Sequence, residues 1–338
     1  MRLILRRATV LGAEDCPEGA EQRLVVEVEG AGEREAVCDT ALYGECRPGD
    51  ELIVNTQASE LALGSGGFDI VHVNLTRGLG GSGVDGAHVM KLNYSSIQHA
   101  VIPVETEDPP RLEGQPVAAC LLHGQLAPLA WAFSRKAEGS RLGLVQGAGG
   151  ALPGNHSRTV SELRERGLLA GFITAGPSYG GEMEAITVAG ALAHAAGELG
   201  WDAIVCAPGP GIIGSGSRLG TGALAAAEAL NSAIALGATA LLVPRLSDSD
   251  PRSRHRGVSH HTRSVASLVL GRALVAWPQG IEQETLATFS ARPGEADLEG
   301  YAASGLPART MGRTIDEDAA FFAAALAAGS VLGELAAG

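Results

Sequence analysis

The sequence predicts an α/β protein of two domains: a small all-β barrel or sandwich over residues 1–108, and a doubly wound, mostly parallel, Rossmann-like domain over residues 117–338. Three observations lead to this fold class. A chain of 338 residues is longer than one hydrophobic core commonly serves. Its first third consists of short apolar runs between Gly, Pro and Asp turns. The remainder alternates apolar runs with helical patterns, as parallel strands and their crossover helices do.

The strands expected in the first domain are short and rich in Val, Ile and Leu. They cover residues 24–29, 36–38, 51–55, 68–74 and 101–104. Turn residues such as those at 47–50 separate them, and no pattern of helical length interrupts them. These features favour a small barrel or sandwich. The polar, proline-rich segment 105–116 that follows is predicted to be a linker.

Strands and helices are predicted to alternate in the second domain. The strands are apolar runs at residues 117–122, 141–146, 168–174, 201–206, 238–243 and 273–277. The helices are expected at residues 126–136, 157–166, 183–199, 221–236 and 258–270. Ser157 or Thr159 is expected to cap the second of these helices. The apolar stretch 319–333 follows an acidic turn and is expected to form an amphipathic or core helix, because it is shorter than the roughly 20 residues that span a bilayer.

Composition restricts the expected class of partner and location. The formal net charge is -13 and the pI is near 5.2, so nucleic acids and anionic membranes are not expected as main partners. The five cysteines are scattered without a C-x-x-C pair, which favours neither a disulfide framework nor a zinc ribbon. The initial apolar run at residues 3–5 is too short for a signal peptide, so the protein is expected to be cytoplasmic.

The most unusual stretch is residues 245–262, which follows the predicted strand 238–243. It concentrates Arg and His in a chain that is acidic as a whole. Holding like charges together costs free energy unless an anion, a metal or a set of carboxylates lies beside them. Glycine-rich and histidine-containing segments follow the other predicted strands, and open parallel sheets bind ligands at the carboxyl ends of their strands. We therefore expect one site at this edge of the sheet.

We assign candidate roles to residues on these loops. The candidate catalytic residues are titratable side chains, namely His255, His260, His261, Asp250 and Glu182. The candidate anion-binding residues supply cations, hydroxyls or accessible backbone, namely Arg252, Arg254, Arg256, Gly209, Gly211, Gly214, Ser215 and His123. Glu182 could instead cap a helix or interact favourably with a helix dipole, and any one of the histidines could be a cap or a salt-bridge partner.

The motif Gly209-x-Gly211-x-x-Gly214 matches the dinucleotide-binding fingerprint, with two reservations. The helix is predicted to begin near Thr221, after the motif, so a pyrophosphate would not meet its N-terminus. The acidic residue expected about 20 positions later is missing. The loop could form an anion-binding nest, or could serve only for tight packing of a helix on the sheet.

The histidines leave the question of a metal open. His260 and His261 are adjacent, so on a helix their side chains are expected to point about 100° apart, which disfavours one metal bound by both. One of them could be a ligand and the other a hydrogen-bonding partner. Asp250 with His255 could complete a carboxylate–histidine set. The cofactor is therefore unknown from the sequence, and a divalent metal is one alternative.

The segment 245–262, together with Gly209-Pro-Gly-Ile-Ile-Gly214, resembles a bacterial family catalogued as a domain of unknown function, family 3866. The order of further motifs agrees, with Pro48-Gly-Asp50, Asn55-Thr56, Leu122-His-Gly124, Ala151-Leu-Pro153 and Gly180-Gly-Glu182. The resemblance covers most of the chain and implies no activity. The chain departs from the family pattern at Pro177, where a histidine is expected, and at Glu182, where an aspartate is expected. Neither position is therefore expected to be an indispensable ligand.

Two classes of function fit these residues. The first is a hydrolase or group transferase acting on a small anionic substrate, phosphorylated or carboxylated, with arginines neutralising the anion and a histidine as acid or base. The second is a non-catalytic anion- or nucleotide-binding regulatory protein, and an NAD(P)-linked oxidoreductase is a third reading. Convergent histidines favour an enzyme, because a simple anion binder has little need for groups that titrate near neutrality. Whether the chain forms a homo-oligomer stays open.

Overall fold

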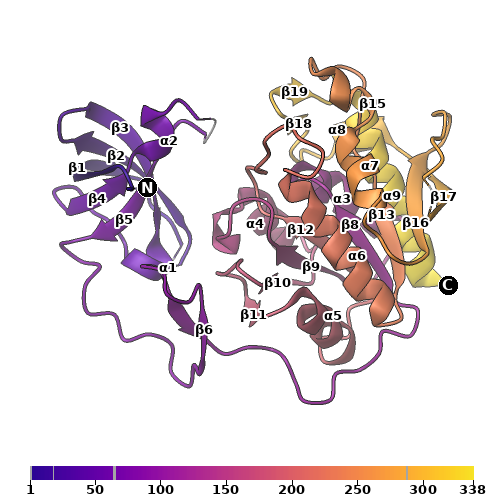
Figure 1. The fold of residues 1–338 in the computed structure, drawn as a ribbon, viewed down its shortest axis with the longest axis horizontal. Helices are drawn as coiled ribbons and strands as arrows, with labels where there is room; N and C mark the ends of the chain where they lie inside the picture. The colour runs from indigo at the N-terminus through magenta and orange to yellow at the C-terminus, as the bar shows by residue number, and fades with distance from the viewer. Residues whose placement is uncertain (1, 18, 64–65, 287) are drawn as a thin grey trace. The chain divides into compact units, whose positions relative to one another are not determined.

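The computed structural model describes residues 2–17, 19–63, 66–286 and 288–338 (Figure 1). The chain divides into two compact units, Met1–Ile102 and Pro103–Gly338. Each unit has its own cluster of buried apolar side chains.

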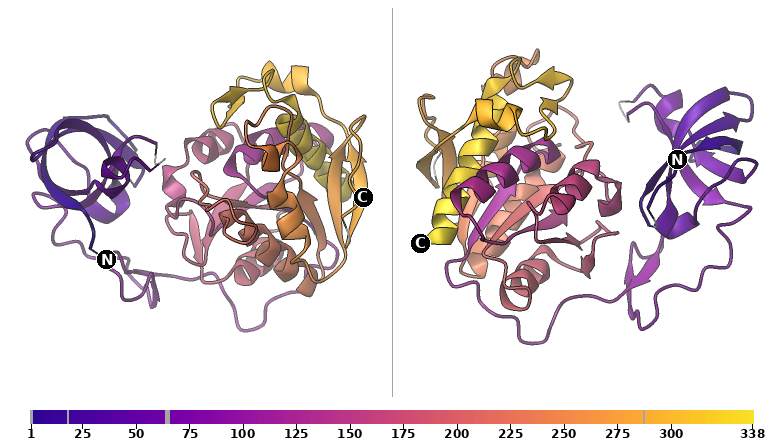
Figure 2. Two further views of the ribbon diagram at one scale, coloured as in Figure 1. Left: turned by 45° about the horizontal axis from the view of Figure 1, so that its top comes forward. Right: turned by 180° about the vertical axis from the view of Figure 1, so that it is seen from behind.

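The first unit contains a closed five-stranded barrel, seen from one end in Figure 2. Its strands are β1 (Leu5–Ala13), β2 (Glu21–Val28), β3 (Gly32–Asp39), β4 (Glu51–Asn55) and β5 (Asp69–Asn74). They close in the order β1-β2-β3-β5-β4, and the β3–β5 pair is parallel whereas the other pairs are antiparallel. Alternate residues of β2, namely Leu24, Val26 and Val28, are buried in the barrel core. The predicted β-barrel is confirmed.

Two features of the first unit differ from the sequence predictions. Strand β1 was not predicted, because its apolar positions are interrupted by Arg6 and Arg7 on the outer face. The predicted strand 101–104 is not part of the barrel. Instead β7 (His99–Val101) pairs antiparallel with β6 (Val89–Lys91) in a separate two-stranded ribbon. The described part of this unit also contains two helical turns, α1 (Thr40–Tyr43) and α2 (Gln57–Glu60).

The second unit is built on an eight-stranded sheet whose neighbouring strands are all parallel. The strands are β8 (Pro116–Cys120), β9 (Leu142–Gly147), β10 (Gly171–Ala175), β11 (Met183–Ala185), β12 (Ala203–Pro208), β13 (Thr239–Val243), β16 (Ala273–Pro278) and β17 (Phe289–Gly294). Their order is β11-β10-β9-β12-β8-β13-β16-β17. The chain therefore starts in the middle of the sheet and builds outward in both directions, which confirms the doubly wound, Rossmann-like prediction.

Helices cover both faces of this sheet (Figures 1 and 2). One face carries α3 (Leu126–Lys136), α4 (Arg158–Glu165), α8 (Leu298–Ala302) and α9 (Ala319–Ala337). The other face carries α5 (Val188–Gly197), α6 (Ala225–Ala235) and α7 (His260–Ala266). The bounds predicted for α3 agree with the structure, and Ser157 caps α4 by accepting a hydrogen bond from the amide of Val160.

Helix α9 is long and apolar enough, by length and composition, to cross a membrane. In this fold 78% of its most apolar 18-residue stretch is buried. It packs against α3 and the strands β8, β13, β16 and β17. The approach to α3 is close, because a Cβ atom added at Gly329 would lie 2.2 Å from the carbonyl oxygen of Leu129. The residues of α9 thus form part of the core of the second unit.

The predicted helix 183–199 is wrong at its start. Residues 183–185 form the edge strand β11, and α5 begins only at Val188. The reason is the hydroxyl of Thr187, which accepts a hydrogen bond from the amide of Gly190 and so fixes the first turn of the helix there.

The predicted helices 221–236 and 258–270 are longer than the helices observed. The first begins with a 3₁₀ turn, Gly222–Leu224, before α6. The second is reduced to α7, because Val258 pairs with Leu246 as part of a two-stranded ribbon. Strand β17 was not predicted, since its run Phe289–Gly294 contains an arginine and a proline and lies at the sheet edge.

Candidate functional site

A cleft of about 620 Å³ lies at the carboxyl ends of β12, β8 and β13, three adjacent strands of the sheet. The loops that follow these strands form most of its wall. The residues that line it are Leu122, His123, Gly124, Thr159, Pro210, Gly211, Ile212, Ile213, Gly214, Gly216, Arg245, Arg252, Arg254, His255, His260, His261, Arg309, Thr310 and Met311. Four arginines and four histidines are among these described residues, and no aspartate or glutamate is.

Residues 245–262, called the Arg/His segment from here on, are brought to the cleft by a short two-stranded ribbon. After β13 the chain forms β14 (Leu246–Ser247), which pairs antiparallel with β15 (Gly257–Val258). The loop between these two strands contains the 3₁₀ turn Ser253–His255. Ser259 then caps α7 by accepting a hydrogen bond from the amide of His261. This arrangement brings the turn and the start of α7 to the same side of the cleft.

Asp250 holds this loop in place through ion pairs with three arginines. Its carboxylate is fully buried and lies 3.1 Å from Nη2 of Arg245, 2.9 Å from Nη2 of Arg252 and 3.4 Å from Nη2 of Arg313. Burial alone would raise the pKa of this carboxyl, but the hydrogen bonds and charge of Arg252 hold it well below its usual range. Its oxygens are occupied by ion pairs, and Asp250 is not among the residues that line the cleft, so these contacts indicate a structural anchor and its catalytic role stays a prediction.

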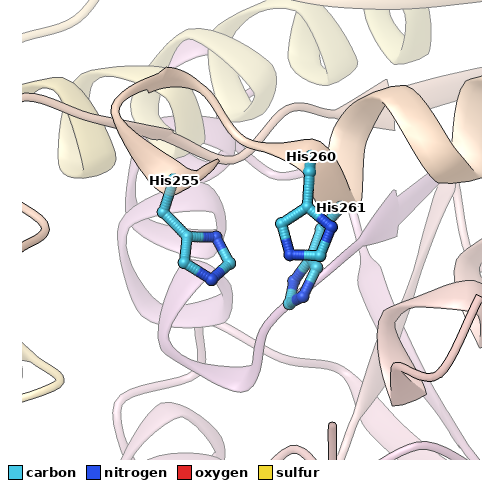
Figure 3. Close-up of side chains that lie close together, drawn as sticks. All are labelled: His255, His260 and His261. Carbon is cyan, nitrogen blue, oxygen red and sulfur yellow. The ribbon is translucent and has the colours of Figure 1, made fainter. Parts of the chain in front are cut away.

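The three histidines of the segment converge (Figure 3). Their ring centroids lie 4.8 Å (His255–His260), 4.9 Å (His255–His261) and 4.4 Å (His260–His261) apart. Each ring offers one nitrogen, and these three atoms all lie within 4.8 Å of one another. The expectation that adjacent His260 and His261 diverge is wrong, because both lie in the first turn of α7 and their side-chain torsions turn the rings toward the same space.

Each ring of this cluster has a different environment. Nδ1 of His255 lies 2.8 Å from the hydroxyl oxygen of Ser259. Nδ1 of His261 lies 3.2 Å from Nη1 of Arg245. The Nε2 atom of His260 is buried and has no hydrogen-bond partner within the described part of the chain.

The environment keeps these rings neutral. Burial, followed by the nearby charge of Arg245, lowers the pKa of His255 to about 3 and that of His261 to about 3. The pKa of His260 is also lowered, by burial and then by the charge of Arg254. At neutral pH the three rings therefore carry one proton each and have one nitrogen lone pair each.

The arginines of the segment divide into two kinds. Arg252 lines the cleft but is ion-paired with Asp250, and Arg256 donates from Nε to the backbone carbonyl of Asp250 and does not line the cleft. Arg254 lines the cleft, and its guanidinium group lies close over Gly216. No described residue forms a hydrogen bond or an ion pair with the Arg254 side chain. Of the three arginines expected to bind an anion, Arg254 is thus the one that both lines the cleft and has no hydrogen-bond or ion-pair partner among the described residues.

His123 lines the cleft, but both of its ring nitrogens are engaged. Nδ1 lies 3.0 Å from the carbonyl oxygen of Pro208, and Nε2 lies 2.8 Å from the hydroxyl oxygen of Ser157. Burial lowers the pKa of this ring, so it is neutral, with Nδ1 donating and Nε2 accepting. The ring joins the loops after β8, β9 and β12. These contacts indicate a structural role, and its expected role in anion binding stays a prediction.

The glycine loop after β12 contributes part of the cleft wall. Gly211 and Gly214 line the cleft, whereas Gly209 and Ser215 do not. A Cβ atom at Gly209 would lie 2.1 Å from the carbonyl oxygen of Ala151, so this glycine is required for close packing of two loops. The hydroxyl of Ser215 is exposed and bonds to Ser217 at 2.9 Å. The structure therefore places Gly211 and Gly214, but not Gly209 and Ser215, where they could contact an anion in the cleft.

Glu182 lies outside the cleft. Its carboxylate accepts hydrogen bonds from Nε of Arg164, at 2.5 Å, and from the amide of Phe172, at 3.3 Å. It precedes the edge strand β11, which three other strands separate from β8 in the sheet. Glu182 is paired with Arg164 and does not line the cleft with the histidines, so its catalytic role stays a prediction that this cleft does not support.

Part of the cleft wall comes from a hairpin that sequence reasoning missed. The strands β18 (Arg309–Thr310) and β19 (Arg313–Thr314) pair antiparallel around Met311 and Gly312, whose φ angles are 47° and 81°. Two positive φ angles in a two-residue loop are those of a type I′ turn. The sulfur of Met311 lies 3.3 Å from Nη2 of Arg245, which holds the hairpin against the cleft. The repeated Arg-Thr around Met-Gly was the available signal.

The model of the family described as "Protein of unknown function (DUF3866)" matches residues 35–329. The match extends over both units and includes every residue that lines the cleft. No curated protein and no solved structure matches the chain. The chemistry of the cleft is therefore the main guide to function.

Proposed function

The chain belongs to the DUF3866 family of proteins of unknown function, and we propose that it binds a small phosphorylated or carboxylated substrate in the cleft for hydrolysis or group transfer. The observation that best supports this proposal is the positive charge of the cleft wall. The described residues that line it include four arginines and four histidines and no carboxylate, in a chain whose formal net charge is -13. Such a concentration of one sign raises the local concentration of anions.

Two arginines have donors available for a ligand. Arg254, from the loop between β14 and β15, and Arg309, from β18, are exposed at the cleft, and neither has an ion-pair partner among the described residues. They come from segments more than fifty positions apart, so the fold brings two free guanidinium groups to one space. Guanidinium groups bind phosphate and carboxylate oxygens in a bidentate manner.

The place and size of the cleft fit a small molecule. The chain leaves β8 toward α3 on one face of the sheet and leaves β13 toward α7 on the other, which opens a crevice between adjacent strands. A volume of about 620 Å³ is within the range of roughly 300–1,000 Å³ that is usual for small-molecule sites.

The neutral imidazoles give the cleft a chemical capacity beyond binding. Their lone pairs can bind a metal ion, which would activate water or a substrate hydroxyl for attack on a bound phosphoryl or carbonyl group. Without a metal, pKa values of about 3 make His255 and His261 weak general bases at neutral pH. Turnover, rather than binding alone, is therefore the function we favour. A dinucleotide-linked reaction has less support, because the helix after Gly214 begins only at the turn Gly222–Leu224.

A ligand titration tests this proposal. Inorganic phosphate, a nucleotide and a dicarboxylate are added to chelator-treated protein, and the midpoint of thermal unfolding and the heat of binding are measured. At least one anion is expected to stabilise the wild type, and R254Q and R309Q should each weaken its binding by about tenfold or more. R218Q is the matched control, because Arg218 is an exposed arginine of the glycine loop that does not line the cleft.

The competing outcomes are distinct. If none of the three anions stabilises the wild type, or if R254Q and R309Q bind the anion as tightly as the wild type and R218Q do, an anion site at these arginines is excluded. Release of inorganic phosphate from a panel of phosphate esters, or of acid from carboxylic esters, separates an enzyme from a regulatory protein that binds the same anions without turnover.

A further inference from the structure

We propose that His255, His260 and His261 form a binding site for one divalent transition-metal ion, with an open coordination position toward the cleft. The site itself rests on the geometry of these three residues. Its coupling to an anion, derived below, rests on the proposed function.

The geometry places three ligand nitrogens around one point. The atoms that the three rings offer lie within 4.8 Å of one another, and His260 and His261 have ring centroids 4.4 Å apart. Nitrogens at about 2.0–2.1 Å from one tetrahedral zinc ion lie somewhat closer together than this, so the rings need only small rotations. Figure 3 shows the ring of His255 coming from the turn, and the other two from the start of α7.

Ser259 orients this set of ligands. Its hydroxyl oxygen lies 2.8 Å from Nδ1 of His255 and accepts a hydrogen bond from the amide of His261. When Nδ1 of His255 donates to this hydroxyl, Nε2 carries the lone pair. A hydrogen bond to the second ring nitrogen is the usual support for a metal-binding histidine, because it fixes both tautomer and ring orientation.

The unpartnered nitrogen of His260 is the second independent observation. Nε2 of His260 is buried without a hydrogen-bond partner among the described residues. A buried polar nitrogen without a partner costs about 1–3 kcal/mol in desolvation. A metal ion coordinated by this atom would remove that cost.

His261 is the ligand whose surroundings must change most. Nη1 of Arg245 lies 3.2 Å from Nδ1 of this ring, so Nη1 has to turn aside if the metal uses Nδ1. The guanidinium group stays anchored meanwhile, because its Nη2 atom is held by Asp250 at 3.1 Å. We therefore infer that His255 and His260 contribute most of the affinity and that His261 completes the site.

The ligand set determines the class of metal. Three imidazoles without a carboxylate or a thiolate suit zinc, cobalt, nickel or copper, whereas magnesium and calcium require oxygen ligands. Three protein ligands leave the fourth tetrahedral position for water or substrate, as in catalytic rather than structural zinc sites.

The arginines add a condition to metal binding. Arg245, Arg252 and Arg254 lie close enough to lower the pKa of the histidines, and they also repel a bare dication held by three neutral ligands. An anion in the cleft would neutralise this charge. If the proposed function holds, metal and phosphate should therefore each increase the affinity for the other by the same factor.

Isothermal titration of zinc and cobalt chloride into tag-free, chelator-stripped protein tests the site. One equivalent of metal is expected to bind, and cobalt should give the visible absorption bands of a tetrahedral complex. H255Q and H260Q should each weaken binding by at least tenfold, whereas the control H88Q, in the first unit, should leave it unchanged. H260Q is the decisive variant because it should leave the fold intact. His260 is only half-buried, and its Nε2 atom has no hydrogen-bond partner among the described residues that the substitution would remove.

Metal binding that is absent, or equally strong in wild type and H260Q, overturns the site. Repeating the zinc titration with phosphate present separates the two proposals. Zinc binding that is lost in H260Q while phosphate does not bind supports the metal site and contradicts the anion proposal. Phosphate binding in chelator without any zinc binding contradicts the metal site alone, and the imidazoles would then be donors to the anion.

Discussion

Nη2 of Arg245 lies 3.1 Å from the carboxylate of Asp250, and both residues are buried, with Arg245 lining the cleft. The same guanidinium group contacts His261 through Nη1 and Met311 through Nη2. Arg245 thus joins the loop after β13, the start of α7 and the β18–β19 hairpin. Burial lowers the pKa of Arg245 to about 10, which still leaves it charged at neutral pH. The structure of the cleft wall therefore requires Asp250, whose carboxylate neutralises the buried charge of Arg245.

Removing that carboxylate should destabilise the second unit. D250N leaves the buried charge of Arg245 without its counter-ion, and loss of one partner of a buried ion pair costs about 3–5 kcal/mol. Chemical denaturation measures the free energy of unfolding. D316N is the control, because Asp316 is exposed and should change stability little. Equal midpoints for the two variants would show that Asp250 does not anchor the loop.

Acidification should destabilise the metal-free protein through the histidine cluster. The pKa of His255 and of His261 is about 3 in the folded protein, against an ordinary value of 6.5. Between pH 6.5 and about 3 the unfolded chain therefore binds more protons than the folded protein does. The stability that the neutral rings contribute is complete above pH 6.5 and is lost progressively as the pH falls toward 3.

Urea denaturation at several pH values in the presence of a chelator measures this slope. H261Q removes one of the two titrating groups, so its unfolding free energy should fall less steeply with decreasing pH than that of the wild type. H72Q, a substitution in strand β5 of the barrel, is the control. The prediction fails if H261Q and the wild type have parallel profiles below pH 6.5.

The contact of α9 with α3 should tolerate no side chain at Gly329. A Cβ atom there would lie 2.2 Å from the carbonyl oxygen of Leu129 and 2.8 Å from Cβ of Ala132. G329V must therefore separate two helices of the core, and overpacking of this kind costs about 1–3 kcal/mol. A337V, at the exposed end of the same helix, should have no such effect. The free energy of unfolding from chemical denaturation distinguishes the two.

Periodicity predicted the parts of the fold that are long and regular. Helix α3 was predicted with its observed bounds, and the alternation of apolar runs and helices gave the parallel sheet. The hairpin β18–β19 escaped prediction because each strand has two residues, which is too short for any period. Arg309 was missed as a consequence, although it lines the cleft.

The candidate site was only partly predictable for a related reason. The sequence indicated that Arg254 and the three histidines follow a strand of the sheet, and the structure brings all four to one cleft. It could not indicate which charged groups are already paired. Asp250 and Glu182 look like free acids in the sequence, whereas contacts with Arg245 and Arg164 occupy them in the fold. Such pairings depend on tertiary contacts.

Salt should weaken anion binding if exposed guanidinium groups carry the affinity. Screening shortens the Debye length from about 10 Å at 0.1 M ionic strength to about 3 Å at 1 M, and it acts most on exposed charges such as those of Arg254 and Arg309. The phosphate affinity of the wild type should therefore fall steadily with added sodium chloride in a calorimetric titration. R254Q removes one of these charges, so its affinity should be lower at low salt and should depend less on salt. R218Q should follow the wild-type curve. A salt dependence that is the same in R254Q and the wild type would mean that Arg254 does not contact the anion.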